Sequence, residues 1–274
     1  MAEPNPDILK QLHEGWAPLK ADVEPLVGQF DGITLSEMDD VALMDRIDTK
    51  YVIQRSKITD LLTLLQPDYR LLDIKGNRLA DYHNLYYDGE GLPLYIAHHN
   101  GKLNRYKVRK RHYAGSDIHF LEIKFKSNRG RTVKSRIRIP EFEMGLSEVE
   151  QHFLREYSPL DPDQLRVSTG IHFSRITFVN KKLTDRCTLD IGLSCDHNNR
   201  LVSHPHFAIC EIKSSRFSRG NDFIRALEKL SVRPLRISKY CTAVLDLYPG
   251  VKYNRFKQKM QYLERLKIPQ HVRA

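Results

Sequence analysis

Apolar and polar residues alternate along several short stretches of the chain, and this period of two predicts β-strands. The stretches are separated by turn-forming residues, among them Asn100-Gly101, Gly115-Ser116-Asp117 and Arg129-Gly130. Strands joined by such short turns pair with their sequence neighbours, so we expect an antiparallel meander. The predicted strands cover residues 50–54, 82–88, 94–98, 105–113, 120–126, 132–139, 175–180, 186–191 and 207–213.

Other stretches have the 3.6-residue spacing of amphipathic helices. Ser147 and Glu150 have the form of a capping box and predict a helix over 148–157 that ends before Pro159. Ser56 precedes a second apolar run at 57–65, and two more helices are predicted at 221–230 and 254–266. Residues 1–35 lack a clear period and contain four prolines, so we expect a short helix and a loose arm there.

These elements predict an α+β protein in three parts. An N-terminal arm or helix covers residues 1–35, and the main domain covers 36–250. The last part, 251–274, is a basic C-terminal helix that we expect to pack on the main domain.

The composition is that of a globular protein, with 41% hydrophobic residues in a chain of 274. No apolar run approaches the length of about 20 residues needed for a membrane helix, and the first residues do not resemble a signal peptide. We therefore expect a soluble, cytoplasmic protein. The 44 lysines and arginines exceed the 34 acidic residues by ten, which favours a polyanionic partner such as nucleic acid, a phosphorylated metabolite or an anionic membrane surface.

Cysteine and histidine spacing gives no metal motif. The four cysteines form no CxxC pair, so we interpret them as buried free thiols. The twelve histidines, which include His112, His119 and His172, form no HExxH pattern, and we assign them no chemistry.

The polar face of three consecutive predicted strands is cationic. In an isolated strand this would indicate a solvated outer face. Like charges on neighbouring strands repel, however, so the set favours a surface that binds an anion. A closed or nearly closed β-barrel or tunnel with a charged interior would direct these cations onto a bound polyphosphate. The cations are Lys107, Arg109, Arg111, Lys124, Lys126, Lys134, Arg136 and Arg138.

Two glutamates share the cationic faces. Glu122 and Glu211 each lie two residues before a lysine. Oxygen ligands suit the hard divalent cations that accompany nucleotide phosphates, so both are candidate metal ligands. The alternative is that each forms internal ion pairs with neighbouring lysines or arginines.

A nucleic-acid-binding module is a second class of hypothesis. Basic strands interleaved with tyrosines could offer stacking platforms along a charged groove. Acidic residues on the same face would repel a nucleic-acid backbone, and they favour a metal-holding tunnel instead. A catalytically silent receptor for polyphosphate or inositol phosphates is not distinguished from an enzyme. The tyrosines are Tyr82, Tyr86, Tyr87, Tyr106 and Tyr113.

Nine short motifs occur in an order that resembles the VTC-type polyphosphate polymerase domain, a branch of the triphosphate tunnel metalloenzyme (CYTH-like) superfamily. Together they span residues 46–240. The motifs are Arg46-Ile-Asp-Thr-Lys-Tyr51, Leu85-Tyr-Tyr-Asp88, Lys107-Val-Arg-Lys-Arg-His-Tyr113, Leu121-Glu-Ile-Lys124, Lys134-Ser-Arg136, Ser174-Arg-Ile-Thr-Phe178, Arg186-Cys-Thr-Leu-Asp190, Cys210-Glu-Ile-Lys213 and Ser238-Lys-Tyr240.

The resemblance implies an antiparallel β-tunnel with a helix packed against it. It implies transfer of the γ-phosphoryl of ATP to a growing inorganic polyphosphate chain with release of ADP, and a divalent metal, Mn²⁺ or Mg²⁺, held by Glu211. Glu122 is the second candidate metal ligand, from its place on the cationic face. ATP and polyphosphate are then the partners, with no role for nucleic acid, while the oligomeric state and a membrane partner that receives the product are left open. By the same resemblance the catalytic phosphate ligands are Lys50, Arg109, Arg111, Lys124, Arg136 (or Lys134 in its place), Arg175, Arg186 and Lys239. The alternation of the cationic strands adds Lys107, Lys126, Lys134, Arg138 and Lys213 as expected substrate contacts.

Two positions depart from related patterns. The hydrolytic and cyclase relatives begin with ExExK, whereas this chain has Arg46, Asp48 and Lys50 in the corresponding places. The missing carboxylate favours the polymerase branch over a tripolyphosphatase or triphosphate hydrolase, which is the alternative on the same fold. Phe173 replaces a tyrosine common in that branch two residues before Arg175, and so removes a hydroxyl group.

Overall fold

The computed structural model describes residues 6–39, 47–214 and 220–267. The α-helices are α1 (Pro6–Val27), α2 (Leu35–Asp39), α3 (Ile58–Leu65), α4 (Pro93–His99), α5 (Glu148–Tyr157), α6 (Asp222–Lys229), α7 (Lys239–Leu247) and α8 (Lys257–Arg265). Short 3₁₀-helices occur at Arg55–Lys57, Pro162–Gln164 and Asn254–Phe256. The strands are β1 (Gly32–Ile33), β2 (Ile47–Gln54), β3 (Tyr69–Leu72), β4 (Ala80–Asp88), β5 (Arg105–Tyr113), β6 (Ile118–Lys126), β7 (Thr132–Ile139), β8 (Arg166–Asn180), β9 (Asp185–His197), β10 (Arg200–His204) and β11 (Phe207–Ser214).

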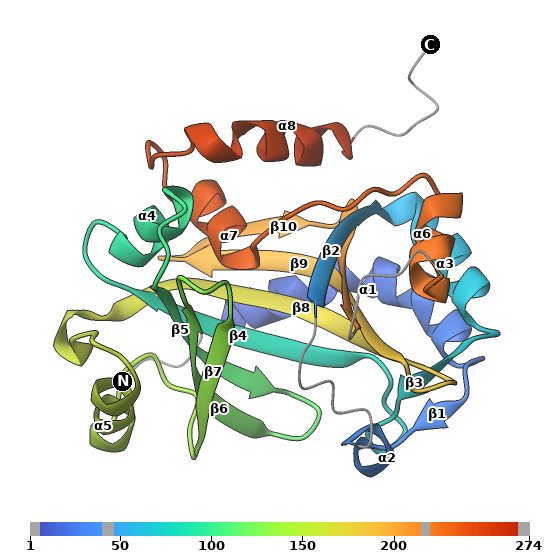
Figure 1. Cartoon of the computed structure of the whole chain (residues 1–274), viewed down its shortest axis with the longest axis horizontal. Coiled ribbons are helices and arrows are strands. Elements are labelled where there is room, and N and C mark those ends of the chain that lie inside the picture. Colours follow the sequence, from blue (N-terminus) through green and yellow to red (C-terminus); the bar gives the residue numbers. More distant parts are fainter. Residues whose placement is uncertain (1–5, 40–46, 215–219, 268–274) are drawn as a thin grey trace.

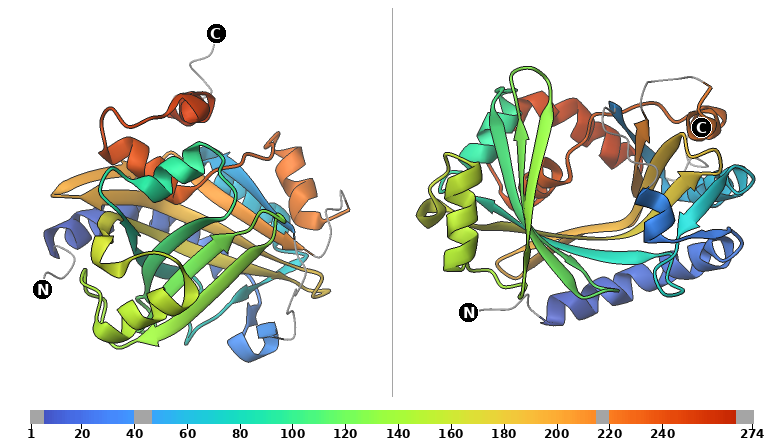
Figure 2. Two further views of the ribbon diagram at one scale, coloured as in Figure 1. Left: turned by 60° about the vertical axis from the view of Figure 1, so that its left-hand side comes forward. Right: turned by 60° about the horizontal axis from the view of Figure 1, so that its bottom comes forward.

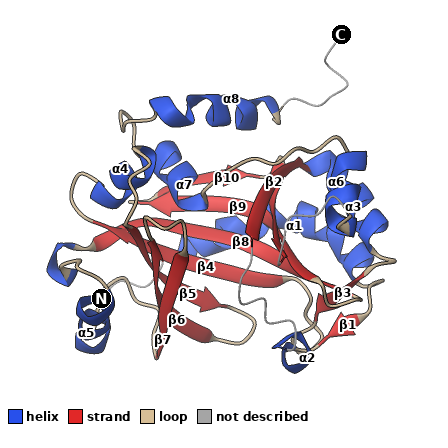
Figure 3. Ribbon diagram, in the orientation of Figure 1, coloured by secondary structure: helices blue, strands red, loops and turns tan. Residues whose placement is uncertain are grey.

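The strands form one strongly curved sheet whose main path is β2-β11-β9-β8-β4-β5-β6-β7 (Figures 1 and 3). Every pair along this path is antiparallel, and among the described strands the short β1–β3 pair is the parallel one. Figure 2 shows β5, β6 and β7 turned away from β8 and β9, so that the sheet curves strongly. We call the concave side of this sheet the hollow, and residues of β2, β5 and β6 line a cavity there. The predicted α+β tunnel fold with flanking helices is therefore confirmed.

Of the closed and nearly closed forms that the sequence left open, the structure has the open one, because β2 and β7 do not pair in the part of the chain that the structure describes. The free edge of β2 is used by the segment that leads into α7. Leu235 donates its backbone N–H to the carbonyl of Lys50 at 2.8 Å, and Pro234 bridges to Tyr51. The tunnel therefore stays open along the β2–β7 side.

Alternation along the central strands divides the sheet into a charged concave face and an apolar convex face. On the convex face, α1, α3 and α6 pack on β2, β8, β9 and β11 in one hydrophobic cluster. Cys187, Leu189 and Cys210 are completely buried there, and all four cysteines are free, as the sequence predicts. The other half of the convex face is covered by α5, where Lys110 of β5 forms a buried 2.7 Å ion pair with Glu150.

One helix lies on the concave side. The apolar residues of α7 pack against β8 and β9, and α4 and α8 cover α7 from outside (Figure 1). This helix agrees with the helix against the tunnel that the resemblance implies. It closes much of one end of the hollow with hydrophobic contacts and leaves the charged residues to line the rest.

Two secondary-structure predictions are wrong. The segment 94–98, predicted as a strand, belongs to α4, because Pro93 begins the helix and the buried carboxylate of Asp88 accepts the backbone N–H groups of Leu94 and Tyr95 at 2.8 and 2.9 Å. The N-terminal segment is one helix of 22 residues rather than a short helix and a loose arm. Leu12, Trp16 and other apolar residues of α1 are buried at helical spacing despite two internal prolines.

Gly192 of β9 allows the packing of α1 on the sheet to be tested, because Trp16 of α1 lies against it. It has a left-handed φ of +64° at a bulge in β9, and a Cβ there would lie 2.9 Å from the indole of Trp16. Left-handed backbone costs most residues about 1–2 kcal/mol, and the contact adds to this cost. We expect Gly192→Ala to lower the free energy of unfolding by about 2–3 kcal/mol in urea titrations.

Gly76→Ala is the matched control. Gly76 has a φ of +83° and open space where its Cβ would lie, so it isolates the backbone contribution of about 1 kcal/mol. Equal losses for the two variants would contradict a close Gly192–Trp16 contact.

No helix among the described residues is long and apolar enough to cross a membrane.

Candidate active site

The concave face of the sheet carries the charged side chains that the alternation predicted. Each strand contributes every second residue, so cations from strands far apart in sequence face the same hollow. β5, β6 and β7 form one wall, while β2, β11, β9 and β8 form the other. The contributing side chains are Asp48 and Lys50 (β2), Glu211 and Lys213 (β11), Arg186 and Asp190 (β9), Arg175 (β8), Tyr86 (β4), Lys107, Arg109 and Arg111 (β5), Glu122, Lys124 and Lys126 (β6), and Lys134, Arg136 and Arg138 (β7).

Glu122 holds cations from both neighbouring strands. Its carboxylate accepts from Arg109 at 2.6 and 2.7 Å and also pairs with Lys134. Burial by itself raises the pKa of Glu122, but Arg109, Arg111 and Lys134 outweigh burial and hold the pKa well below its usual range. Because both oxygens are engaged by cations and the side chain is only 2% exposed, Glu122 fits internal ion pairing better than metal binding.

Arg109 is further held by Tyr86, whose hydroxyl oxygen accepts from the guanidinium at 2.8 Å. Arg111 donates to the side-chain oxygen of Asn84 at 2.9 Å. Both partners lie on β4, directly opposite the arginines in the strand register. The two guanidinium groups are therefore oriented before any ligand arrives, which reduces the entropy lost on binding.

Asp190 orients a second pair of cations on the opposite wall. Arg175 donates two parallel hydrogen bonds to this carboxylate, at 2.5 and 2.8 Å, and Lys239 from the first turn of α7 pairs with the same group. Burial raises the pKa of Asp190, but Arg175 and Lys239 together hold it well below its usual range. Arg175 and Lys239 also lie over the ring of Phe173, at 5.3 and 4.3 Å from its centre.

Glu211 lies among lysines at the β2–β11 pair. Its carboxylate pairs with Lys213 and lies 3.7 Å from the Nζ of Lys50. In the strand register Glu211 is opposite Lys50 and Asp48 is opposite Lys213, so the two carboxylates alternate with the two lysines on one face. Burial by itself raises the pKa of Glu211, but Lys213 and Lys50 outweigh burial and hold the pKa well below its usual range.

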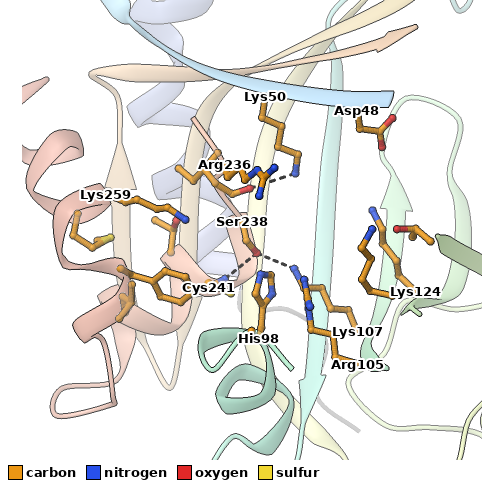
Figure 4. Close-up of a pocket in the computed structure, with 18 of the residues that line it drawn as sticks. Asp48, Lys50, His98, Arg105, Lys107, Lys124, Arg236, Ser238, Cys241 and Lys259 are labelled. Carbon is orange, nitrogen blue, oxygen red and sulfur yellow. Dashed lines mark hydrogen bonds between the residues drawn. The ribbon is translucent and has the colours of Figure 1, made fainter. Parts of the chain in front are cut away.

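A cavity of about 660 Å³ opens beside these residues, between β2, β5, β6, α4, α7 and α8. Figure 4 shows Lys50 and Asp48 on β2 facing Lys107 and Lys124 on β5 and β6. Among the lining residues described, seven are lysine or arginine and one is a carboxylate, so the cavity suits an anion. The charged lining residues are Asp48, Lys50, Arg105, Lys107, Lys124, Lys126, Arg236 and Lys259.

Burial lowers the pKa of two lysines at this site. Lys107, which donates to Ser238 at 2.9 Å, has a pKa of about 8, and so has Lys239. For Tyr86, burial raises the pKa, but Arg109, Lys107 and Arg111 outweigh it and lower the pKa to about 8. These groups therefore change charge near physiological pH.

Tripolyphosphate, used as a probe anion, should bind this cavity less tightly as pH rises through about 8. A bound polyanion stabilises the ammonium form of Lys107 and the neutral form of Tyr86, so binding raises both pKa values and takes up protons near pH 8. Isothermal titration calorimetry in buffers of different ionisation enthalpy measures this uptake directly. In Lys107→Arg the charge persists at every accessible pH, so the uptake and the pH dependence should both decrease. A pH-independent affinity between pH 7 and 9 would contradict this expectation.

A model of the VTC domain family matches residues 45–248 of the chain. The chain belongs to the VTC domain family. The comparison with curated proteins found no significant match. Two solved structures are similar to this VTC domain at 12% identity: a candidate adenylyl cyclase from Hippeastrum with dominant triphosphatase activity (TM-score 0.49, covering 76% of this chain and 99% of that one), and a candidate adenylate cyclase from Vibrio parahaemolyticus (TM-score 0.43, covering 71% and 94%).

The VTC domain brings most of the predicted site residues to one hollow, but three of them lie at its margins. Arg136 and Arg138 are exposed on the edge strand β7, where Arg136 lies 4.6 Å from the ring centre of Phe120. Lys126 donates to the backbone carbonyl of Gly130 in its own hairpin. Arg46, the first residue of the opening motif, lies outside the described residues.

Sequence reasoning missed several groups of the VTC domain that position the cations. Asn84 and Tyr86 share the period of Tyr82 in a strand that was predicted, so alternation alone could have placed them on the charged face. Asp190 was part of a recognised motif without a role. Ser238 was likewise the first residue of a recognised motif without a role. Arg236 had no local signal, because the loop before α7 reaches the cavity only in three dimensions.

Proposed function

We propose that this VTC domain is a metal-dependent polyphosphate polymerase that transfers the γ-phosphoryl of ATP to the end of a growing polyphosphate chain and releases ADP. The observation that carries the proposal is a hollow with oriented cations on two facing walls, continuous with a cationic cavity of about 660 Å³. A linear polyphosphate carries charge along its whole length, so its recognition calls for cations along a path rather than in one pocket.

The proposed phosphate ligands form two groups, arginines that hydrogen bonds fix in place and lysines that can move. Arg109, Arg111 and Arg175 are fixed by Tyr86, Asn84 and Asp190, and they present planar donors for phosphate oxygens. Lysines act as movable point charges that follow the phosphate as it is transferred. This second group comprises Lys50, Lys107, Lys124, Lys134, Lys213 and Lys239, while Arg136, Arg138, Arg186 and Lys126 would contact phosphates toward the margins.

The residues around Glu211 fit a hard divalent cation. Its carboxylate is 20% exposed on the hollow, and Asp48 lies diagonally across the β2–β11 pair. Mg²⁺ and Mn²⁺ typically bind one or two carboxylates together with substrate phosphates. We propose that Glu211, assisted by Asp48, holds the metal, while Lys50 and Lys213 turn to the phosphate. The bound metal would neutralise charge on the phosphate oxygens during transfer.

The chemistry proposed for the chain's own residues is positioning and charge stabilisation. Phosphoryl transfer passes through a transition state with charge spread over the transferred group, and it needs no protein nucleophile. Arg109 and Arg111 on one wall and Arg175 on the other would hold successive phosphates in line. Asp190 and Glu122 keep the arginines oriented, so little reorganisation is needed as charge develops.

The test is incubation of the purified protein with ATP and Mn²⁺ or Mg²⁺, following ADP and free phosphate while products are resolved by length on a gel. ADP together with lengthening chains is the expected result, and the reaction should stop when the metal is chelated. Free phosphate without chains would overturn the polymerase and assign a triphosphate hydrolase on the same scaffold. Tight triphosphate binding without turnover would overturn the enzyme and leave a receptor.

A further inference from the structure

Four histidines form a row across the convex face of the sheet, opposite the charged hollow. His172, His83, His112 and His119 come from β8, β4, β5 and β6, and each is the direct register partner of the next. Their ring centres are 5.1, 5.7 and 4.5 Å apart along the row. The proposed polymerase makes no use of them.

One end of the row converges on an acidic side chain. The β5–β6 turn places Asp117 so that its Oδ1 lies 3.1 Å from Nε2 of His112 and 3.3 Å from Nε2 of His119. Within the ranges the structure describes, this is the group in which three potential metal-ligand atoms come together. Asp117 is 82% exposed, so the group is open to solvent.

The hydrogen-bond partner of Nδ1 determines the tautomer of His119, and the tautomer determines what its Nε2 presents to Asp117. Nδ1 of His119 lies 3.2 Å from the backbone carbonyl of Pro140, which can only accept a hydrogen bond, so Nδ1 carries a proton. In the neutral ring Nε2 then presents a lone pair toward a carboxylate oxygen. Two acceptors 3.3 Å apart need a cation between them or a second proton on the ring.

The arrangement matches the second shell of known metal-binding histidines. Such a histidine commonly donates its other ring N–H to a backbone carbonyl, which fixes the tautomer and the ring orientation. Phe142 packs against both rings, at 5.5 Å from His112 and 5.9 Å from His119. A tetrahedral metal with bonds of about 2.0–2.1 Å separates its ligand atoms by about 3.3 Å. The distances of 3.1 and 3.3 Å from Asp117 Oδ1 to the two ring nitrogens are close to this value.

We propose that His112, His119 and Asp117 bind a borderline transition-metal cation, Zn²⁺ being the best fit, at the tip of the β5–β6 hairpin. Two imidazoles and one carboxylate suit Zn²⁺ better than Mg²⁺ or Mn²⁺, and a water molecule would complete the tetrahedron. The site is separate from the proposed catalytic metal, because its residues project from the opposite face of the sheet.

The consequence for the protein is a clamp on the hairpin that carries Arg109, Arg111 and Glu122. His112 and His119 come from adjacent strands, and Asp117 comes from the turn that joins them. A ligand that binds only the folded protein raises its stability, so Zn²⁺ should raise the unfolding temperature.

The first test is titration of the metal-stripped full chain with Zn²⁺ in the presence of a competing chelator, which measures the affinity. In the second test Co²⁺ replaces Zn²⁺, and its absorption spectrum is expected to be that of a tetrahedral site. Loss of an outer-shell partner alone lowers metal affinity about 10–100-fold. We therefore expect His112→Ala or His119→Ala to lower Zn²⁺ affinity by at least about 100-fold and to abolish the thermal shift. His152→Ala removes an exposed histidine of α5 and should change neither.

Equal Zn²⁺ affinity in the wild type and both histidine variants would overturn the proposal, as would an octahedral Co²⁺ spectrum. The contact of His119 with Asp117 would then be an ion pair of a protonated ring. Glu211→Gln should retain Zn²⁺ binding at the hairpin, and simultaneous loss of binding in that variant would place the metal in the hollow instead.

Discussion

Replacing Arg109 and Arg111 together by alanine should weaken triphosphate binding strongly. The protein should remain folded at a lower stability, because Lys134 still pairs with the buried Glu122. Each arginine is oriented by a β4 partner toward the hollow, and hydrogen bonds to charged groups contribute about 1.5–3 kcal/mol each. The expected loss of affinity is therefore about 100-fold or more. Calorimetric titration with tripolyphosphate or a non-hydrolysable ATP analogue measures it, and circular dichroism checks the fold.

The matched control removes two positive charges from exposed helix surfaces away from the hollow. Arg155 on α5 and Arg225 on α6 are 53% and 61% exposed, each with a long contact of 3.6 Å to an aspartate. Arg155→Ala with Arg225→Ala should leave affinity nearly unchanged, apart from a small effect of net charge that salt screens. If both double variants bound triphosphate equally well, the proposal that the hollow binds phosphate would be wrong.

Glu211→Gln should reduce turnover by about 100-fold or more and weaken its dependence on the divalent cation, because a bound metal supplies several kcal/mol of charge stabilisation. Triphosphate binding should change much less, since the amide removes a negative charge beside Lys50 and Lys213. Metal titrations of the initial rate, together with binding measured without metal, separate the two effects. A metal dependence equal to that of the wild type would exclude Glu211 as the ligand.

Glu122→Gln distinguishes a metal ligand from an ion-paired carboxylate. Glu122 is almost fully buried between Arg109 and Lys134, and breaking a buried pair by removing one partner costs about 3–5 kcal/mol. We expect this variant to lose stability while the metal dependence of any remaining turnover is unchanged. Denaturant unfolding and the same metal titration give the two readouts.

Local sequence patterns predicted the strands and helices whose ends are determined by residues close by in the sequence. The strands predicted at 105–113 and 132–139 and the helix at 148–157 have the bounds of β5, β7 and α5, because alternation, a capping box and short turns all act within a few residues. From these strands the shared cationic face followed directly.

The elements that the sequence left out depend on distant contacts. The helix α7 has a buried face because it packs on the concave side of the sheet. The edge of β2 pairs with a segment almost two hundred residues later in the chain. The convergence of His112 and His119 likewise appears only once the β5–β6 register is known. Metal-ligand spacing along a helix has a recognisable sequence pattern, whereas spacing across a hairpin depends on turn length.

Among the described residues no strand pairs with the outer edge of β7, and this has a consequence for self-association. An exposed strand edge is a template for pairing with another chain, and proteins commonly guard such edges with charged side chains. Lys134, Arg136 and Arg138 occupy alternate positions along this edge strand. Two β7 edges brought together would place these like charges opposite one another. We therefore expect the cations that face the hollow also to oppose edge-to-edge pairing of two copies of this open-sided sheet.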